Sequence, residues 1–216
     1  MDLTSNQISV EKYRHKAAGY DQSAEFTMPL RRRTVAGLNL QPGDVVLDVG
    51  AGTGLSYELL LNAVGPGGRV LAFEQSPDMF ERARARVERQ AWSHVWHTCA
   101  AAEEVVLPEP ADAVLFNYTH DILRTPAAVN NILRQCKPGA RVAVAGIKFF
   151  PWWTGPLNLL AWAKNRPYNA KAADLWSPWD ILQARCAVFE RENTQWGMGY
   201  IARGVLSVAD ENPQKT

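Results

Sequence analysis

Short apolar runs alternate along this chain with segments in which apolar residues recur at helical spacing. Five segments have the length and pattern of strands in a parallel sheet. They are residues 45–49, 69–74, 94–99, 112–117 and 141–145. Helices are predicted between the strands, one carried by Leu55, Leu59, Leu60 and Leu61 and two over 77–90 and 126–136. Because strands alternate with helices, the pattern predicts a parallel sheet with right-handed crossovers.

The two ends of the chain complete this domain. Residues 1–40 are predicted to form an N-terminal helical cover, with short helices over 10–20 and 29–38. Near the other end, 187–192 and 200–208 have the pattern of a closing antiparallel pair. No internal repeat or second domain is visible. The prediction for 1–216 is a single α/β domain, a Rossmann-like, doubly wound, mostly parallel seven-stranded sheet with helices on both faces.

Residues 148–179 interrupt the regular order of strands and helices. This segment follows the fifth predicted strand and holds five of the chain's eight tryptophans, which are Trp152, Trp153, Trp162, Trp176 and Trp179. Because it emerges where the carboxyl ends of parallel strands meet, it is predicted to be a lid that walls a ligand pocket. Two alternatives stay open. The rings would fill core and cover the sheet edge, or they would contact a membrane interface.

Three glycines at alternate positions follow the first predicted strand directly. The sequence reads Asp48-Val49-Gly50-Ala51-Gly52-Thr53-Gly54. Glycines let the backbone turn sharply and let a ligand lie against bare amides. Glu74 ends the second predicted strand, where a doubly wound sheet places the carboxylate that holds ribose hydroxyls. A cofactor that contains a nucleoside is therefore predicted.

The glycine spacing distinguishes between such cofactors. The dinucleotide fingerprint Gly-x-Gly-x-x-Gly would need its third glycine at position 55, which is Leu55. A Gly-Lys-Ser/Thr phosphate loop does not occur in the sequence. Asp48 lies inside the strand, and a carboxylate there suits a ligand with an ammonium group better than a pyrophosphate. S-adenosylmethionine has an ammonium group and a sulfonium, whereas an NAD enzyme stays the alternative.

At this point the chain resembles the class I S-adenosylmethionine-dependent methyltransferases. The resemblance covers residues 45–144 and rests on the glycine loop, on Glu74 and on the Cys136-Lys137-Pro138-Gly139 turn before the fifth strand. It implies a methyltransferase whose cofactor is S-adenosylmethionine. The cofactor-binding residues are then expected to be Tyr20, Asp48, Gly50, Ala51, Gly52, Thr53, Gly54, Glu74, Gln75, Ala101, Ala102 and Asn117.

Two of these expectations depend on how the sequence compares with the family. Many relatives carry an aspartate after the third strand that touches the adenine, but this chain has Ala100-Ala101-Ala102 there. Backbone amides of Ala101 and Ala102 are therefore expected to serve instead. Tyr20 belongs to a segment that folds over the cofactor in many relatives, and the alternative is that it packs between helices.

The residues after the fourth strand are the predicted catalytic rim. They read Asn117-Tyr118-Thr119-His120-Asp121. His120 is placed to take a proton near neutral pH, and Asp121 would orient it. The alternative is that Asp121 caps the following helix and His120 is only polar rim. No metal site is predicted, because His94 and His97 should face opposite sides of a strand.

Composition agrees with an ordinary enzyme domain. The chain has 216 residues, of which 47% are hydrophobic and 21% charged, and this excludes a disordered protein. The net charge of +1 gives no indication of a nucleic-acid partner. The three cysteines are scattered, and no apolar leader or membrane-length run occurs. These features predict a cytoplasmic protein with reduced thiols.

The acceptor of the methyl group is not encoded in a motif. The Asn-Pro-Pro-Tyr type of signature, found in enzymes that methylate amino groups of DNA and proteins, is absent. A small-molecule acceptor, methylated on nitrogen, oxygen or carbon, is therefore predicted. Residues 38–49 also resemble bacterial phospholipid N-methyltransferases, so a lipid headgroup with peripheral membrane contact is the alternative. A protein that binds S-adenosylmethionine without transferring its methyl group is a further one.

Overall fold

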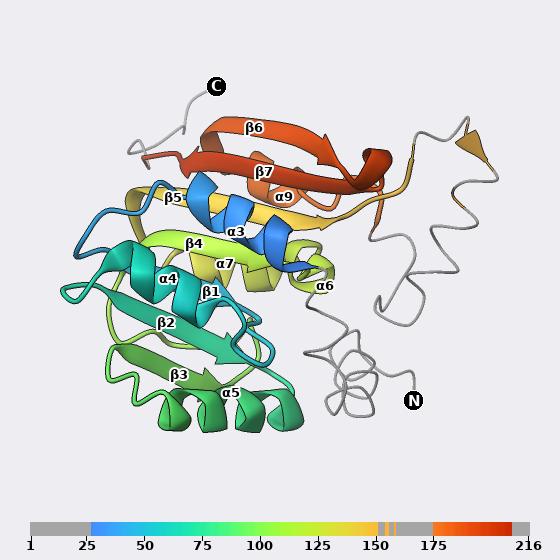
Figure 1. Cartoon of the computed structure of the whole chain (residues 1–216). Helices are drawn as coiled ribbons and strands as arrows, with labels where there is room; N and C mark the ends of the chain where they lie inside the picture. The colour runs from blue at the N-terminus through green and yellow to red at the C-terminus, as the bar shows by residue number, and fades with distance from the viewer. Residues whose placement is uncertain (1–26, 151–153, 156–157, 159–174, 209–216) are drawn as a thin grey trace, which may run out of the picture.

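The structure is a computed structural model that describes residues 27–150, 154–155, 158 and 175–208 (Figure 1). Several sequence predictions lie outside these residues. They are the helix over 10–20, Tyr20, the tryptophans at 152, 153 and 162, and most of the predicted lid.

One mixed sheet organises the described part of the chain. Its strands are β1 (Val45–Val49), β2 (Arg69–Glu74), β3 (Val95–Cys99), β4 (Ala111–Asn117), β5 (Cys136–Ile147), β6 (Cys186–Thr194) and β7 (Gly199–Leu206). They lie in the order β3-β2-β1-β4-β5-β7-β6. The first five strands pair in parallel, and β7 pairs antiparallel with both β5 and β6. The predicted seven-stranded, mostly parallel sheet is confirmed.

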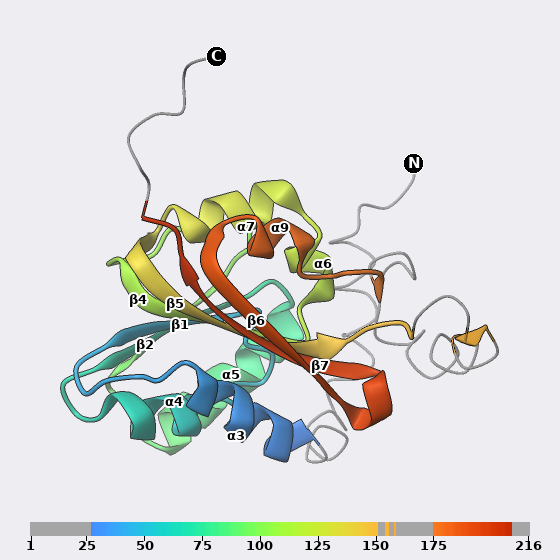
Figure 2. The same ribbon diagram turned by 90° about the horizontal axis from the view of Figure 1, so that it is seen from above.

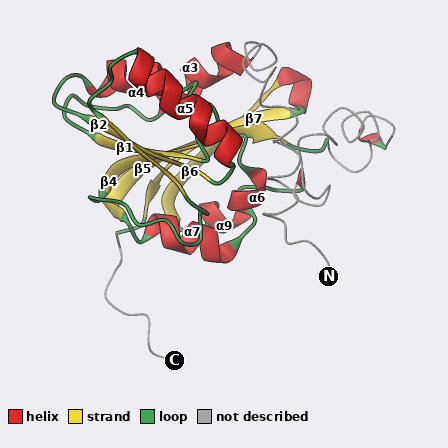
Figure 3. Cartoon of the chain, turned by 90° about the horizontal axis from the view of Figure 1, so that it is seen from below, coloured by secondary structure: helices red, strands yellow, loops and turns green. Residues whose placement is uncertain are grey.

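Helices cover both faces of this sheet (Figures 2 and 3). One face carries α3 (Met28–Gly37), α4 (Tyr57–Val64) and α5 (Pro77–Arg89), and the other carries α6 (His120–Leu123), α7 (Pro126–Leu133) and α9 (Asp180–Gln183). The short 3-10 turn η5 (Gln195–Gly197) joins β6 to β7. The predicted doubly wound arrangement is thereby confirmed.

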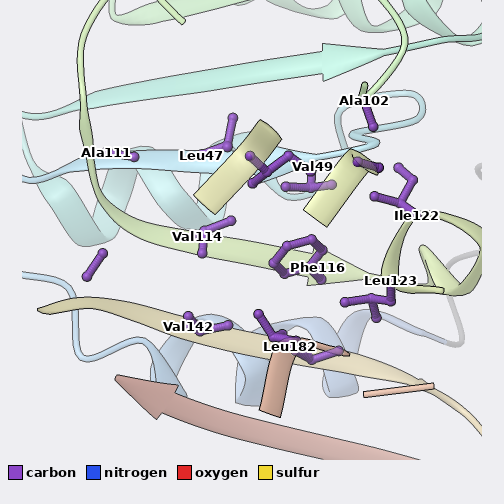
Figure 4. Close-up of a cluster of buried hydrophobic side chains, with 14 of the residues drawn as sticks. Leu47, Val49, Ala102, Ala111, Val114, Phe116, Ile122, Leu123, Val142 and Leu182 are labelled. Carbon is purple, nitrogen blue, oxygen red and sulfur yellow. The ribbon is translucent and has the colours of Figure 1, made fainter. Parts of the chain in front are cut away.

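The strand sequences explain why both faces are covered. Side chains of a strand point alternately to opposite faces, and in β1 both sets are buried, with Asp48 as the one polar member. Leu47 and Val49 pack with Phe116 and Leu182 in the core shown in Figure 4. Val46 packs with Leu60 of α4 in a second core on the other face. A strand buried on both sides forms the centre of such a sheet.

The start of β5 differs from the prediction of a turn over 136–139. Cys136 already pairs with Ala111 of β4, and the two strands shift register just after this pair. Gly139 has a φ of 74°, which lets the strand bend within its own length. Lys137 Nζ also lies 2.7 Å from Asp112 Oδ1. The bend is thus a bulge inside a long strand, and α7 ends at Leu133 before it.

The two described tryptophans of the 148–179 segment differ in role. Trp179 is 6% exposed and packs edge-on against Tyr200, with ring centroids 4.7 Å apart. Trp179 therefore fills core, as the alternative interpretation held. Trp176 is 46% exposed and lies against Phe149. Among the helices of the described residues, none combines the length and hydropathy required to cross a bilayer.

Candidate active site

A pocket opens where the strand order reverses between β1 and β4. In doubly wound sheets, ligands bind at this reversal, beyond the carboxyl ends of the strands. The pocket encloses about 600 Å³, including solvent at its mouth. Its lining comes from α3, from the ends of β1, β2 and β4, and from the segments that follow these strands. The lining residues are Arg31, Gly50, Ala51, Gly52, Phe73, Glu74, Gln75, Ser76, Met79, Asn117, Tyr118, Thr119, Asp121 and Ile122.

The glycine loop forms the floor of this pocket with bare backbone. Gly50 has a φ of 57°, which side chains disfavour, and a Cβ there would lie 2.9 Å from Thr119 Cγ2. The loop returns to β2 through a 3.0 Å hydrogen bond that the Ala51 amide donates to the Phe73 carbonyl. Any side chain at position 50 would therefore occupy space between the loop and β4. Glycine keeps that space open.

Glu74 closes the pocket at the end of β2. Its two carboxylate oxygens accept backbone N–H groups, one from Gly52 and one from Ser76, each at 2.8 Å. Burial raises the pKa of Glu74 to about 7, although these two hydrogen bonds oppose the rise. Gln75 contributes a further backbone hydrogen bond, and a carboxylate with about four lone-pair sites can still accept another donor. The carboxylate is thus fixed in place and ready to accept hydroxyl groups of a ligand.

A hydroxyl at the centre of the site joins three of its elements. Ser56 is fully buried, and its Oγ accepts hydrogen bonds from Arg31 Nη1 at 2.9 Å and from Asn117 Nδ2 at 3.4 Å. Ser56 also hydrogen-bonds the side chain of Asp48. Burial raises the pKa of Asp48 to about 7, while the charge of Arg31 opposes the rise. Ser56 therefore holds a carboxylate, a guanidinium and an amide together.

The site has spare polar groups that suit an S-adenosyl cofactor. Within the described part of the chain, Asp48 Oδ2, Asn117 Oδ1 and Thr119 Oγ1 are buried and have no hydrogen-bond partner. Buried polar atoms in folded proteins almost always have partners. Carboxylate and amide oxygens accept from ammonium, amino and hydroxyl groups, and S-adenosylmethionine carries all three. The residues present therefore fit this cofactor.

Comparisons with known proteins identify the family. A family model described as a methyltransferase domain matches residues 46–139. A protein-L-isoaspartate O-methyltransferase of Aeropyrum pernix is 34% identical over 107 residues, which are 50% of this chain and 40% of that protein. A demethylmenaquinone methyltransferase of Symbiobacterium thermophilum is 30% identical over 160 residues, which are 64% of this chain and 63% of that protein. The chain thus spans less than two thirds of either relative.

The fold agrees with these matches. A solved SAM-dependent methyltransferase from Aquifex aeolicus superposes with a TM-score of 0.69 and 20% identity, over 89% of this chain and 97% of that one. Residues 46–139 match a methyltransferase domain, and the fold is that of a class I S-adenosylmethionine-dependent methyltransferase. The resemblance seen in the glycine loop and the cofactor predicted from it are both confirmed.

The pocket brings together seven of the residues predicted from sequence. They are Gly50, Ala51, Gly52, Glu74, Gln75, Asn117 and Asp121. Asp48 and Thr53 are each 1% exposed, outside the lining, and Asp48 is bonded to Ser56. Gly54 takes its place further along the loop, where its amide donates to the Ala51 carbonyl at 3.0 Å. Sequence-local spacing thus predicted residues that the fold brings to one pocket, and their contact with the cofactor stays a prediction.

The two alanines expected near the adenine lie elsewhere. Ala102 is 1% exposed and belongs to the core with Leu47 and Val105. The Ala101 carbonyl accepts the amides of Glu104 and Val105 in a turn, and neither alanine lines the pocket. Met79 and Gln75 line it instead. The adenine interactions predicted for Ala101 and Ala102 therefore have no support in this geometry.

His120 is turned away from the pocket. Its side chain is buried, and its Nε2 accepts the backbone N–H of Ile147 at 2.9 Å. Burial lowers the pKa of His120 to about 4, so that the imidazole stays neutral at physiological pH. A ring nitrogen that already accepts a hydrogen bond is a poor proton acceptor. This geometry argues against the predicted role of His120 as a base and makes it a link between α6 and β5.

Arg31 is the pocket residue that the sequence interpretation missed. Its run of three arginines suggests a solvated helix surface, yet Arg31 is 5% exposed whereas Arg32 is exposed. A signal was present in the spacing, because Val35 and Leu38 follow Arg31 at four and seven residues and share its buried face. Arginine at an otherwise apolar helix position indicates a buried partner or ligand.

Proposed function

We propose that this chain transfers the methyl group of S-adenosylmethionine to a small-molecule acceptor with a nitrogen, oxygen or carbon nucleophile. One observation carries the proposal. A single pocket joins the glycine loop and Glu74 to the rim after β4, where Tyr118 and Asp121 lie. Donor and acceptor must meet in one cavity, and the two halves of this pocket supply a place for each.

The chain's own residues contribute binding and orientation. When bound, S-adenosylmethionine supplies a methyl group already activated by its sulfonium. Glu74 accepts hydroxyl groups, Asn117 Oδ1 accepts an amino group, and the glycine-loop backbone lies against the ligand. Orientation of two reactants is worth roughly 7–11 kcal/mol of the barrier. These residues would hold the methyl carbon of the bound cofactor in line with the acceptor's lone pair, opposite the carbon–sulfur bond that must break.

The proton of the acceptor is the next step. A neutral amine needs no base before attack, whereas a hydroxyl, thiol or acidic carbon must lose its proton. Of the two predicted catalytic residues, only Asp121 lines the pocket. Asp121 is therefore the proposed proton acceptor for such a nucleophile, and His120 supports the position of α6.

Between the two relatives described above, the extent of the match favours a small organic acceptor over a protein. The isoaspartate relative aligns over 107 residues, about the length of the cofactor half. The relative named for demethylmenaquinone aligns over 160 residues, so it also shares chain beyond that half. Since acceptor residues in this fold lie largely outside the cofactor half, the longer match is the more informative one.

A phospholipid headgroup is the second candidate, and exposed tryptophans favour it. Trp196 at the tip of the β6–β7 hairpin is fully exposed, and Trp176 is 46% exposed. Both tryptophans lie near the residues that follow β5. Trp176 packs at a tilt against Phe149, and Phe150 lies close to Gly197, the neighbour of Trp196. Tryptophan at such positions is typical of membrane interfaces. Both rings would face the lipid from the acceptor end of the sheet.

Methyl transfer to a panel of acceptors tests the proposal. Purified protein is incubated with methyl-labelled S-adenosylmethionine and, separately, with quinols, catechols, primary amines, an isoaspartyl peptide and phosphatidylethanolamine vesicles. We expect label and stoichiometric S-adenosylhomocysteine with one of the small molecules, and none with the peptide. Cofactor binding without label in any acceptor would contradict the proposal and favour a non-catalytic binding protein.

Vesicle flotation separates the lipid candidate. We expect the small-molecule enzyme to stay with the unbound fraction and Trp196→Ser to leave turnover unchanged. Vesicle binding and lipid methylation that are both lost in Trp196→Ser would instead establish the phospholipid acceptor. Val106→Ser, at another exposed apolar residue, is the matched control.

A further inference from the structure

A buried guanidinium lines the cofactor pocket, close to the Asp48 carboxylate but not hydrogen-bonded to it. Arg31 lies in the first turn of α3, which begins at Met28, and it is 5% exposed. Its Nη1 donates to Ser56 Oγ at 2.9 Å, and its Nε donates to Thr27 Oγ1 at 3.3 Å. Both partners are neutral hydroxyls. Among the residues that the structure describes, no carboxylate forms an ion pair with Arg31.

The donor count of this side chain is incomplete. A guanidinium has five N–H donors in a planar fork, and the two hydroxyls take two of them. The remaining donors belong to a side chain that borders the pocket. A buried charge without a partner is costly unless an opposite charge completes it. Asp48 offsets part of this charge, and the arrangement favours a second anion among the contents of the pocket.

The surroundings of Arg31 identify which anion fits. Ser56 holds Arg31 on one side and the Asp48 carboxylate on the other. A cation and an anion that share one hydroxyl match an α-amino acid, whose carboxylate and ammonium group are attached to the same carbon. S-adenosylmethionine ends in such a group. A planar fork binds a carboxylate through two parallel hydrogen bonds, which a lysine ammonium does not provide.

We propose that Arg31 binds the α-carboxylate at the methionine end of the cofactor, with Ser56 and Asp48 holding the guanidinium in place. This inference rests on the proposed function, because that function names the ligand. A carboxylate on the acceptor is the other source of the same chemistry. The two sources differ in a simple respect: the cofactor carboxylate is bound when no acceptor is present.

Binding of two ligands that differ only in the carboxylate tests the inference. S-adenosylhomocysteine and its decarboxylated analogue are titrated by calorimetry into the wild type, Arg31→Met and Arg31→Lys. We expect the wild type to prefer S-adenosylhomocysteine by about 10–100-fold, the range of a buried hydrogen bond to a charged group. Arg31→Met should lose that preference and bind the decarboxylated analogue within about twofold of the wild type. Arg31→Lys should retain part of it.

The matched control is Arg32→Met, one residue further along the same helix. Arg32 is exposed, so we expect this variant to leave both affinities unchanged. An equal loss of both ligands in Arg31→Met and Arg31→Lys would overturn the inference, since Arg31 would then only support the shape of the site. Unchanged affinity for S-adenosylhomocysteine would overturn it as well and assign Arg31 to the acceptor.

The inference and the proposed function fail in different ways. A wild type that binds S-adenosylhomocysteine with the expected preference but methylates no acceptor would contradict the proposed function alone. A wild type that transfers methyl groups but binds the decarboxylated analogue equally well would contradict the assignment of Arg31 alone.

Discussion

Glu74 concentrates the recognition of the cofactor in one side chain. Both of its oxygens are held by backbone N–H groups, and the carboxylate lines the pocket with acceptor capacity left. Glu74→Gln keeps the shape but turns an NH2 group against one of these N–H donors. We expect affinity for S-adenosylhomocysteine to fall by about 10–100-fold, since a charge-assisted hydrogen bond contributes roughly 1.5–3 kcal/mol. Isothermal titration measures this directly.

The control for Glu74 is an acidic residue that lies outside the pocket. Glu104 is exposed, and Glu104→Gln removes the same charge without touching the pocket. Equal and small losses in both variants would mean that another group holds the ribose.

The two buried carboxylates of the site make the stability of the fold depend on pH. Burial raises the pKa of Asp48 from 3.8 to about 7 and that of Glu74 from 4.5 to about 7. The folded protein thus holds these protons more tightly than the unfolded chain. The free energy of unfolding should therefore decline as pH rises from about 4 to about 7, as proton linkage requires.

Binding of S-adenosylmethionine has the opposite preference, because its positive charges favour the ionised carboxylates. We expect its affinity to rise between about pH 6 and pH 8 and protons to be released on binding near neutral pH. Calorimetry in two buffers with different ionisation enthalpies counts these protons. An affinity that is flat over this range, with no protons released, would show that neither carboxylate changes its charge on binding.

Residues that act through local spacing could be predicted from the sequence, and residues that act across the fold could not. Asp48 and the glycines are neighbours in the chain, and Glu74 follows at a distance that one helix and one strand dictate. Arg31 meets Ser56 across 25 residues, and His120 meets Ile147 across 27. Those contacts depend on how α3 and α6 pack, which no short motif records.

At the scale of elements, the turn from the glycine loop into α4 depends on Gly54. Its φ is 77°, and a Cβ there would lie 2.6 Å from Cε2 of the buried Tyr57 ring. Gly54→Ala should lower the free energy of unfolding by about 1–3 kcal/mol through backbone strain and displace the loop. Urea denaturation measures the loss of unfolding free energy. Titration with S-adenosylhomocysteine shows whether displacement of the loop weakens binding.

A second glycine provides the comparison for Gly54. Gly37 ends α3 with ordinary helical backbone, and a Cβ on this residue would meet no other atom within 4 Å. Gly37→Ala should change stability by no more than about 1 kcal/mol, in the stabilising direction. If both variants lost the same stability, the strain assigned to Gly54 would be wrong.

The tryptophan-rich segment divides into core and surface at its described end. Trp179 packs on Tyr200, and the guanidinium of Arg191 lies 4.0 Å from the centre of its ring. Trp179→Ala should cost about 3–5 kcal/mol of unfolding free energy, as large core truncations do. Trp176→Ala, at a half-exposed ring, should cost less than about 1 kcal/mol. Denaturant titration measures both losses of unfolding free energy. Equal losses in the two variants would contradict the division into core and surface.

Hydrophobic periodicity predicts the order and type of the helices and strands, but it does not predict irregular backbone such as the bulge in β5. The strand over 69–74 and the helix from Pro77 were predicted within a residue of their bounds. The Pro138-Gly139 pair indicated a turn, but strand pairing with β4 absorbed it as a bulge. Turn residues favour a bend without specifying whether the sheet continues through it.

At the scale of the whole molecule, the pocket lies between β1 and β4, where the strand order reverses. A ligand in it therefore contacts residues from both halves of the sheet. α3 supplies Arg31, the loop after β1 supplies bare amides, and β2 and β4 supply Glu74 and Asn117. A ligand that binds only the folded state stabilises it by RT ln(1 + [L]/Kd), about 2.7 kcal/mol at one hundred times Kd. Cofactor binding should therefore raise the resistance of the entire domain to heat.

We expect S-adenosylhomocysteine at that concentration to raise the Tm by about 5–10 °C, since 1 kcal/mol shifts a domain of this size by about 2–4 °C. NAD at the same concentration should leave the Tm unchanged, because Leu55 occupies the position of the third glycine of a dinucleotide loop. Glu74→Gln should lose most of the shift without losing the fold. Differential scanning calorimetry of both proteins with each ligand decides between the two cofactors. Stabilisation by NAD and not by S-adenosylhomocysteine would overturn the account of the pocket, from the loop backbone to the role of Glu74.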